Sequence, residues 1–207
     1  MNLSLLIILP VVASLAILAV RDAKQVRVVA LLGSLLQLAL VAWLTLAYAN
    51  ARNAGAAAQF LFEQRAVWFS AFNIQYYVGV DGISVAMMGL TALVVVAGVL
   101  VSWKVEKMTK EFFFLLLFLS AGAYGFFMSL DLFVMFFFLE LAVIPKFLLI
   151  AIWGSGRKEY SANKLALMLM GGSALVFVGL LGIYFYSPLT PGGGTGTFDL
   201  VALSHTH

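Results

Sequence analysis

The sequence of residues Asp131–Trp153, DLFVMFFFLELAVIPKFLLIAIW, decides the fold class. It is a nearly continuous apolar run that contains a carboxylate (Glu140), a proline (Pro145) and a lysine (Lys146). A helix of about 20 apolar residues crosses the hydrocarbon core of a bilayer. Ionisable side chains at membrane depth are costly, and they usually face protein or water along an ion or proton path. The stretch therefore predicts a transmembrane helix that carries a functional carboxylate.

Composition extends this conclusion to the whole chain. Hydrophobic residues make up 64% of it and charged residues 10%, whereas a soluble domain has about 25% charged residues. The formal net charge of +3 comes from basic residues in short connections, so it does not indicate nucleic-acid binding. Because the chain has no cysteine, it excludes disulfides, thiol catalysis and iron–sulfur ligation by its own residues. Its only histidines, His205 and His207, are at the C-terminal end, so no predicted span offers a histidine to ligate a buried haem. The sequence also lacks a metal-ligand cluster and a phosphate-binding loop.

Six segments are long and apolar enough to span the membrane. They are residues 3–20, 28–48, 82–103, 112–130, 132–153 and 162–186. All are predicted to be α-helices, because an open sheet edge cannot face lipid. The predicted fold class is therefore all-α, a polytopic transmembrane helix bundle. The long connection at residues 49–81 is expected to carry a short extended or interfacial element.

The distribution of basic residues predicts the orientation. The connections one-two, three-four and five-six hold eight of them: Arg21, Lys24, Arg27, Lys104, Lys107, Lys110, Arg157 and Lys158. The opposite side holds only Arg52 and Arg65. Connections rich in lysine and arginine stay on the inner side of the membrane, so both termini are expected on the outer side.

Glu140 is predicted to lie near the middle of the membrane. It is eight residues from the start of its span, which corresponds to about 12 Å along a helix. A carboxylate there must be protonated, paired or hydrated, and this suits a group that takes up and releases protons. The alternative is a neutral glutamic acid that only bonds one helix to another. Lys146 points about 120° away round the helix and is no i,i+4 partner for Glu140. It either snorkels to the inner surface or modulates the site.

Four further residues have expected roles. Lys164, near the inner start of the sixth span, either snorkels or lies on an inner route toward Glu140. Asp81 and Asp131 precede the third and fifth spans and are expected to cap those helices or support the site. Pro145 cannot donate a backbone hydrogen bond, which predicts a kink in the fifth helix. Small residues are expected to pack helices closely; they include Gly98, Ser102, Gly125, Ser129, Gly171, Gly172, Gly179 and Gly182.

Three stretches together resemble a known family. They are YVGVDGIS at residues 77–84, DLFVMFFFLELAVIPKFLLIAIWG at 131–154, and RKEYSANKLALMLMGG at 157–172. Over essentially its whole length the chain is similar to the M-type, antiporter-like membrane subunit of proton-pumping NADH:quinone oxidoreductase, respiratory complex I. The resemblance implies that quinone reduction elsewhere in the complex drives proton translocation through this subunit. Glu140 matches the family's fifth-helix glutamate, and Lys164 matches a sixth-helix lysine. At Lys146 the family pattern has an apolar residue or methionine.

The resemblance also implies how the chain is organised and what surrounds it. Residues 1–111 correspond to helices one to three with an outer loop at 49–81. Residues 112–186 correspond to the first three helices of the first antiporter-like repeat, and residues 187–207 to an outer-side tail. Family members continue with a broken seventh helix whose lysine pairs with the glutamate. Expected partners are therefore the remainder of an M-type subunit, L-type and N-type subunits, and the lipid bilayer, with no nucleic acid.

The enzymatic label implied by the resemblance belongs to the complex. NADH, FMN, iron–sulfur clusters and quinone are expected in other subunits, and no redox centre or metal site is expected in this chain. The expected location is the bacterial inner (plasma) membrane. Two alternatives remain at this point. The chain is a subunit of a multi-chain sodium/proton antiporter or membrane-bound hydrogenase, or it is a structural membrane subunit that transports nothing.

Overall fold

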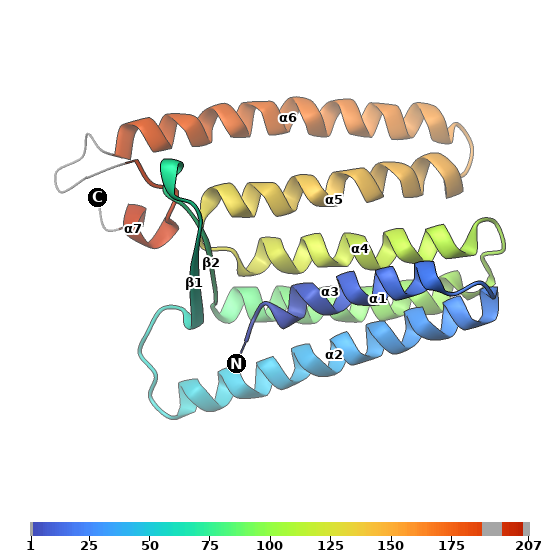
Figure 1. Cartoon of the computed structure of the whole chain (residues 1–207), viewed down its shortest axis with the longest axis horizontal. Helices are drawn as coiled ribbons and strands as arrows, with labels where there is room; N and C mark the ends of the chain where they lie inside the picture. Colours follow the sequence, from blue (N-terminus) through green and yellow to red (C-terminus); the bar gives the residue numbers. More distant parts are fainter. Residues whose placement is uncertain (1, 188–195, 205–207) are drawn as a thin grey trace.

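The computed structural model describes residues 2–187 and 196–204 as six long helices side by side, with a two-stranded hairpin across one end (Figure 1). The long helices are α1 (Leu5–Ala19), α2 (Ala23–Asn53), α3 (Gly82–Val101), α4 (Thr109–Met128), α5 (Leu132–Trp153) and α6 (Lys158–Tyr186). The hairpin is formed by β1 (Leu61–Phe69) and β2 (Ile74–Val80), and a short helix, α7 (Leu200–Ser204), lies at the same end. Single 3-10 turns occur at Ser70–Phe72 and Ser102–Lys104. Parts of the predicted tail, residues 188–195 and 205–207, lie outside the described residues.

The six predicted helices are confirmed, and α2 and α6 extend furthest beyond the apolar segments that predict them. Five of them are long and apolar enough to cross a membrane, whereas α1 has 15 residues, or about 22 Å. Helix α2 begins at Ala23, capped by the Asp22 side chain, which accepts a hydrogen bond from Lys24 N at 3.2 Å. It continues to Asn53, so it is five residues longer than predicted at each end. An apolar window misses polar turns such as these, because a helix propagates beyond the hydrocarbon wherever its residues favour it.

The expected extended element in residues 49–81 is an antiparallel hairpin. Its strands pair Arg65 with Tyr77, and Asn73 turns the chain with a left-handed conformation, φ 52°. Asparagine tolerates that conformation better than most residues. The hairpin is tied to the turn between α4 and α5, where Leu130 N donates to Tyr77 O at 2.8 Å. It therefore closes one end of the bundle at the start of α5.

Helix α4 lies at the centre and packs against α1, α2, α3 and α5. Among the described residues, the one helix with which α6 makes extensive contacts is α5. The approach of α4 to α5 depends on small residues. A Cβ on Gly122 would lie 3.1 Å from Ala142 Cβ, and one on Gly125 would overlap the Phe138 ring. Close packing at Gly125 is therefore confirmed. For the sixth helix the expectation stays a prediction, because none of the described residues lies within 4 Å of a Cβ built on Gly171, Gly172, Gly179 or Gly182.

The basic connections gather at the end of the bundle opposite the hairpin (Figure 1). Arg27 Nη2 donates to Val105 O at 3.2 Å, which joins the start of α2 to the connection between α3 and α4. Trp153 Nε1 donates to Lys107 O at 2.7 Å, which joins the end of α5 to the same connection. One end of the bundle is therefore basic, and the other carries the hairpin and α7.

Candidate functional site

Glu140 contacts Ser173 across the interface between α5 and α6. Ser173 Oγ lies 2.5 Å from Glu140 Oε1, and it also lies 2.8 Å from the carbonyl oxygen of Leu169 one turn earlier in α6. One turn toward the hairpin, the rings of Phe136 and Phe177 pack with centroids 5.7 Å apart. Both side chains of the polar contact are half-buried. The membrane carboxylate predicted from sequence is therefore bonded to the neighbouring helix.

Glu140 has no cationic partner within the part of the chain that the structure describes. The only ion pair among residues 2–187 and 196–204 joins Arg65 to Asp199. Glu140 also lies about 200° round α5 from Phe138 and Ala142, which contact α4. The carboxyl group thus faces α6 and is turned away from the centre of the bundle. Among the side chains of the described residues, only the Ser173 hydroxyl bonds to this carboxyl group.

Lys164 is not brought to Glu140. It is exposed and makes no hydrogen bond among the described residues. Lys164 precedes Ser173 by nine residues, which is half a turn at 100° per residue, so it lies on the opposite side of α6. The buried Ala162 lies on the same side as Ser173. An inner route from Lys164 along the α5–α6 interface is therefore not formed by these helices.

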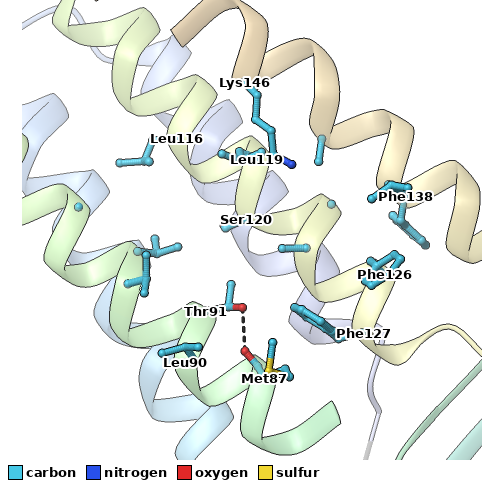
Figure 2. A pocket seen from close by; sticks show the side chains of 17 residues that line it. Met87, Leu90, Thr91, Leu116, Leu119, Ser120, Phe126, Phe127, Phe138 and Lys146 are labelled. Atoms are coloured by element: carbon cyan, nitrogen blue, oxygen red, sulfur yellow. Dashed lines mark hydrogen bonds between the residues drawn. The ribbon is translucent and has the colours of Figure 1, made fainter. Parts of the chain in front are cut away.

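Lys146 lies at a cavity on the other side of α5. The cavity has a volume of about 520 Å³ and is bounded by α3, α4 and α5. Figure 2 shows the Lys146 side chain extending from α5 into it, toward Leu119 and Ser120 of α4. Met87, Phe126 and Phe127 bound its far end. The ammonium is thus the single charged group on an apolar wall, on a different face from Glu140.

The two predicted helix caps form hydrogen bonds. Asp81 Oδ1 accepts from Ser84 N at 2.7 Å at the start of α3. Asp131 Oδ1 accepts from Phe133 N at 2.9 Å and Val134 N at 3.1 Å, and its Oδ2 accepts from Gln75 N at 3.0 Å. Asp131 therefore caps α5 and also holds the hairpin. Burial raises the pKa of the Asp131 carboxyl, the three backbone hydrogen bonds lower it, and the charge of Asp199 raises it; the net shift is upward.

Pro145 is buried inside α5, which runs through it as one helix from Leu132 to Trp153. A proline removes one donor from the helical ladder, so the carbonyl of Leu141, the residue directly after Glu140, loses its usual partner. The predicted kink at this position stays a prediction. No group of three or more His, Cys, Asp or Glu that suits a metal occurs in the described part of the chain.

A polar network joins the hairpin to the segment before α7. Arg65 Nη2 lies 2.5 Å from Asp199 Oδ2, and its guanidinium carbon lies 3.9 Å from the centre of the Tyr77 ring. Tyr77 OH donates to Glu63 Oε2 at 2.5 Å. Burial raises the pKa of the Tyr77 hydroxyl, and the bond to Glu63 raises it further. These contacts fix the end of the bundle from which Asp131 begins α5.

Sequence reasoning missed Ser173 and Arg65. A serine in an apolar helix carries no signal of its own, and only the contact with Glu140 distinguishes Ser173 from other serines. Arg65 and Asp199 are 134 residues apart, and nothing in the sequence pairs them. A signal for Ser173 does exist once Glu140 is suspected, because a buried carboxyl group needs a hydrogen-bonding partner on an adjacent helix.

Comparisons with known proteins agree with this arrangement. Residues 129–206 match the family model described as NADH:quinone oxidoreductase/Mrp antiporter, transmembrane. The chain is 32% identical to NAD(P)H-quinone oxidoreductase chain 4-2 of Synechocystis sp. over 97% of its own length and 34% of that protein. It is 36% identical to the chloroplastic chain 4 of Angiopteris evecta over 66% of its own length and 27% of that protein.

Solved structures have the same helix arrangement. A chain of respiratory complex I from Thermus thermophilus with bound NADH superposes with a TM-score of 0.81 at 25% identity, covering 99% of this chain and 39% of that one. A chain of an archaeal membrane-bound sulfane sulfur reductase superposes with a TM-score of 0.72 at 20% identity, covering 89% of this chain and 37% of that one; this second match bears on the fold alone.

The chain spans about a third of the length of the curated relatives that it matches, 34% for the protein from Synechocystis sp.. The family model covers α5 with Glu140, α6 with Ser173, and Asp199. The likeness to the curated relatives extends over the remaining helices and the hairpin. Residues 129–206 are thus similar to the transmembrane domain of the NADH:quinone oxidoreductase/Mrp antiporter family, and 97% of the chain is similar to the N-terminal third of an NAD(P)H-quinone oxidoreductase chain 4.

Proposed function

We propose that the chain is part of a proton-translocating membrane subunit of an NADH:quinone oxidoreductase, and that Glu140 is its mid-membrane site of proton exchange. Electron transfer from NADH to quinone in other subunits supplies the driving force. The observation that carries the proposal is the carboxyl group of Glu140 within an apolar span, bonded to Ser173 of α6 and without a cation from the described residues. Such a group is suited to neutralise and ionise in turn.

Several parts of this proposal rest on the resemblance to subunits of complex I. NADH, FMN, iron–sulfur clusters and quinone belong to the complex and are bound outside this chain. The partners are L-type and N-type subunits and the segments of an M-type subunit from the seventh helix onward, one of which supplies the cation for Glu140. Transporter sites form where the helices of a repeat meet, and this places the missing cation on the side of α5 and α6 that carries Glu140. The location is the bacterial inner membrane.

Lys164 and Lys146 are proposed to modulate the site without touching it. Lys164 is exposed on the far side of α6, so it acts by contacting a neighbouring segment or through its charge near the basic end. Lys146 faces the cavity beside α4. Replacing either lysine by methionine is expected to change proton translocation less than replacing Glu140.

The orientation is proposed from the basic connections. The end of the bundle that holds Lys107 and Arg157 faces the inner side, and the hairpin end faces the outer side. Single cysteines introduced at Lys107 and Arg157 should react with an impermeant thiol reagent only from the inside, and one at Ala56 only from the outside. The reverse pattern would overturn the orientation.

The test of function is Glu140→Gln in the assembled complex. Glutamine keeps the shape and hydrogen bonding of the side chain and cannot release a proton. Proton translocation per NADH oxidised is expected to fall by at least half while the complex still assembles. Glu111→Gln is the matched control, because Glu111 is exposed in the first turn of α4. Full translocation by the Glu140→Gln complex would favour the purely structural role.

One observation favours a second candidate, a sodium/proton antiporter subunit, because the matching family model also describes Mrp antiporters. The candidates differ in what accompanies the chain. Purification from native membranes should bring down NADH-oxidising activity and flavin for the oxidoreductase, and neither for the antiporter. Membrane preparations that exchange sodium for protons without NADH would identify the second candidate.

A further inference from the structure

We propose that Ser173 is the positioning residue for Glu140, and that its hydroxyl group reverses the direction of its hydrogen bond when Glu140 loses or gains a proton. The proposal rests on the proposed function of Glu140 as a site of proton exchange and adds a partner and a mechanism to it. Ser173 touches the carboxyl group directly, from the helix that faces it.

The count of protons at the site carries the argument. Ser173 Oγ has two close oxygens, Glu140 Oε1 at 2.5 Å and Leu169 O at 2.8 Å. A hydroxyl group has one hydrogen, and both a carbonyl oxygen and an ionised carboxylate only accept. When Glu140 is ionised, the two acceptors compete for the single hydroxyl hydrogen, whereas a protonated Glu140 supplies a second hydrogen, so that each contact has its own. The geometry fits a directed chain in which Glu140 O–H donates to Ser173 Oγ, and Ser173 O–H donates to Leu169 O.

Ionisation of Glu140 changes the donor. The O–H bond of Glu140 breaks, its proton passes to a water molecule, and Ser173 keeps its own proton. Rotation about the Cβ–Oγ bond then turns the serine hydroxyl from Leu169 O to Glu140 Oε1, which forms a charge-assisted hydrogen bond. Leu169 O retains its helical bond from the Ser173 backbone N–H. The exchange needs no movement of either helix.

This arrangement supplies a partner for both forms of the carboxyl group. The neutral form has an acceptor for its proton, and the ionised form has a donor. No other side chain among the described residues bonds to Glu140, so without Ser173 the ionised form has no donor from this part of the chain. Loss of a hydrogen bond to a charged group slows the step that creates the charge by about tenfold, or about 1.4 kcal/mol.

Infrared difference spectroscopy of the purified complex tests the proposal directly. The carbonyl stretching band of protonated Glu140 is identified as the band that Glu140→Gln removes from pH-difference spectra. In Ser173→Ala this band should move to higher wavenumber, because the acid proton loses its acceptor. Ser173→Thr keeps a hydroxyl at the same position and should return the band to its original place. Ser129→Ala is the matched control, since Ser129 Oγ also donates to the carbonyl four residues back, Gly125 O at 2.7 Å, and contacts no carboxylate.

Proton translocation measured on the same preparations gives the second readout. Ser173→Ala should translocate about tenfold more slowly, and Ser173→Thr at close to the original rate. An unmoved band in Ser173→Ala, or a band displaced equally in Ser173→Thr, would overturn the role of Ser173. It would also be overturned if Glu140→Gln removed no band. Normal translocation by Glu140→Gln would instead overturn the proposed function, and the band positions would still decide the hydrogen bond.

Discussion

Arg65 Nη2 and Asp199 Oδ2 lie 2.5 Å apart and join β1 to the segment before α7. The pair stands at the hairpin end of the bundle, where Leu200 N donates to Leu130 O and Leu132 N donates to Phe198 O, both at 2.9 Å. Residues 196–204 are thereby held against the turn from which α5 begins. The ion pair is the part of this attachment that depends on charge.

Arg65→Ala should weaken the attachment only slightly. The Arg65 side chain is 50% exposed, and ion pairs between exposed groups contribute about 0.2–1 kcal/mol. Asp199→Ala should cost more, by about a further 1 kcal/mol, because Asp199 Oδ1 also accepts from Val201 N at 2.9 Å and Ala202 N at 3.1 Å. Thermal unfolding of the purified complex shows which of the two variants is destabilised more. Arg157→Ala is the control, because Arg157 is an exposed arginine at the other end of the bundle. A larger effect of Arg65→Ala than of Asp199→Ala would contradict this account.

Asp131 should make stability depend on pH. Burial raises the pKa of its carboxyl group in the folded chain, so the folded state binds a proton more tightly than the unfolded state does. Its stabilising contribution is then complete below the unfolded pKa of about 4. This contribution decreases as the pH rises through the raised, folded pKa.

The measurement is the unfolding temperature as a function of pH. Asp131→Asn should remove this decrease and lower stability at every pH. The side-chain amide has only one oxygen, so it cannot replace both Oδ1, which accepts from Phe133 N and Val134 N, and Oδ2, which accepts from Gln75 N. Asp22→Asn is the control, since the exposed Asp22 accepts from Lys24 N alone. The same pH dependence in both variants and in the parent would show that Asp131 has no part in it.

The sequence predicts the helices better than it predicts their partners. Helix α5 has the predicted bounds, because Asp131 is a cap and Gly154 follows the last apolar residue. Helix α2 is longer than predicted, because polar residues also propagate a helix outside lipid. The position of Glu140 along α5 follows from helix geometry, whereas its contact with Ser173 depends on how α5 and α6 rotate against each other. The same holds for Lys164, because its side of α6 is set by packing at Ala162, and its functional role stays a prediction.

Gly125→Ala should destabilise the bundle. A Cβ at this position would overlap the Phe138 ring, which is itself packed between α4 and α5. Overpacking of this kind costs about 1–3 kcal/mol. Gly172→Ala is the matched control, because nothing lies within 4 Å of a Cβ there, and alanine favours a helix over glycine by about 1 kcal/mol. The unfolding temperature should fall in the first variant and be equal or higher in the second. Equal behaviour of both variants would mean that α4 and α5 approach less closely than in this structure.

Lys146→Met should raise stability. The ammonium of Lys146 extends into an apolar cavity (Figure 2) and has no ion pair or hydrogen bond among the described residues. A half-buried charge without a partner is unfavourable against an apolar wall, and replacing it by an apolar group of similar length removes that cost and keeps the wall filled. Lys110→Met, at the start of α4, controls for the loss of a positive charge elsewhere. The unfolding temperature should rise for Lys146→Met alone, and proton translocation should fall less than in Glu140→Gln. A lower unfolding temperature of Lys146→Met would show that an anion from outside these residues pairs with Lys146, because only such a partner would make the ammonium stabilising in that cavity.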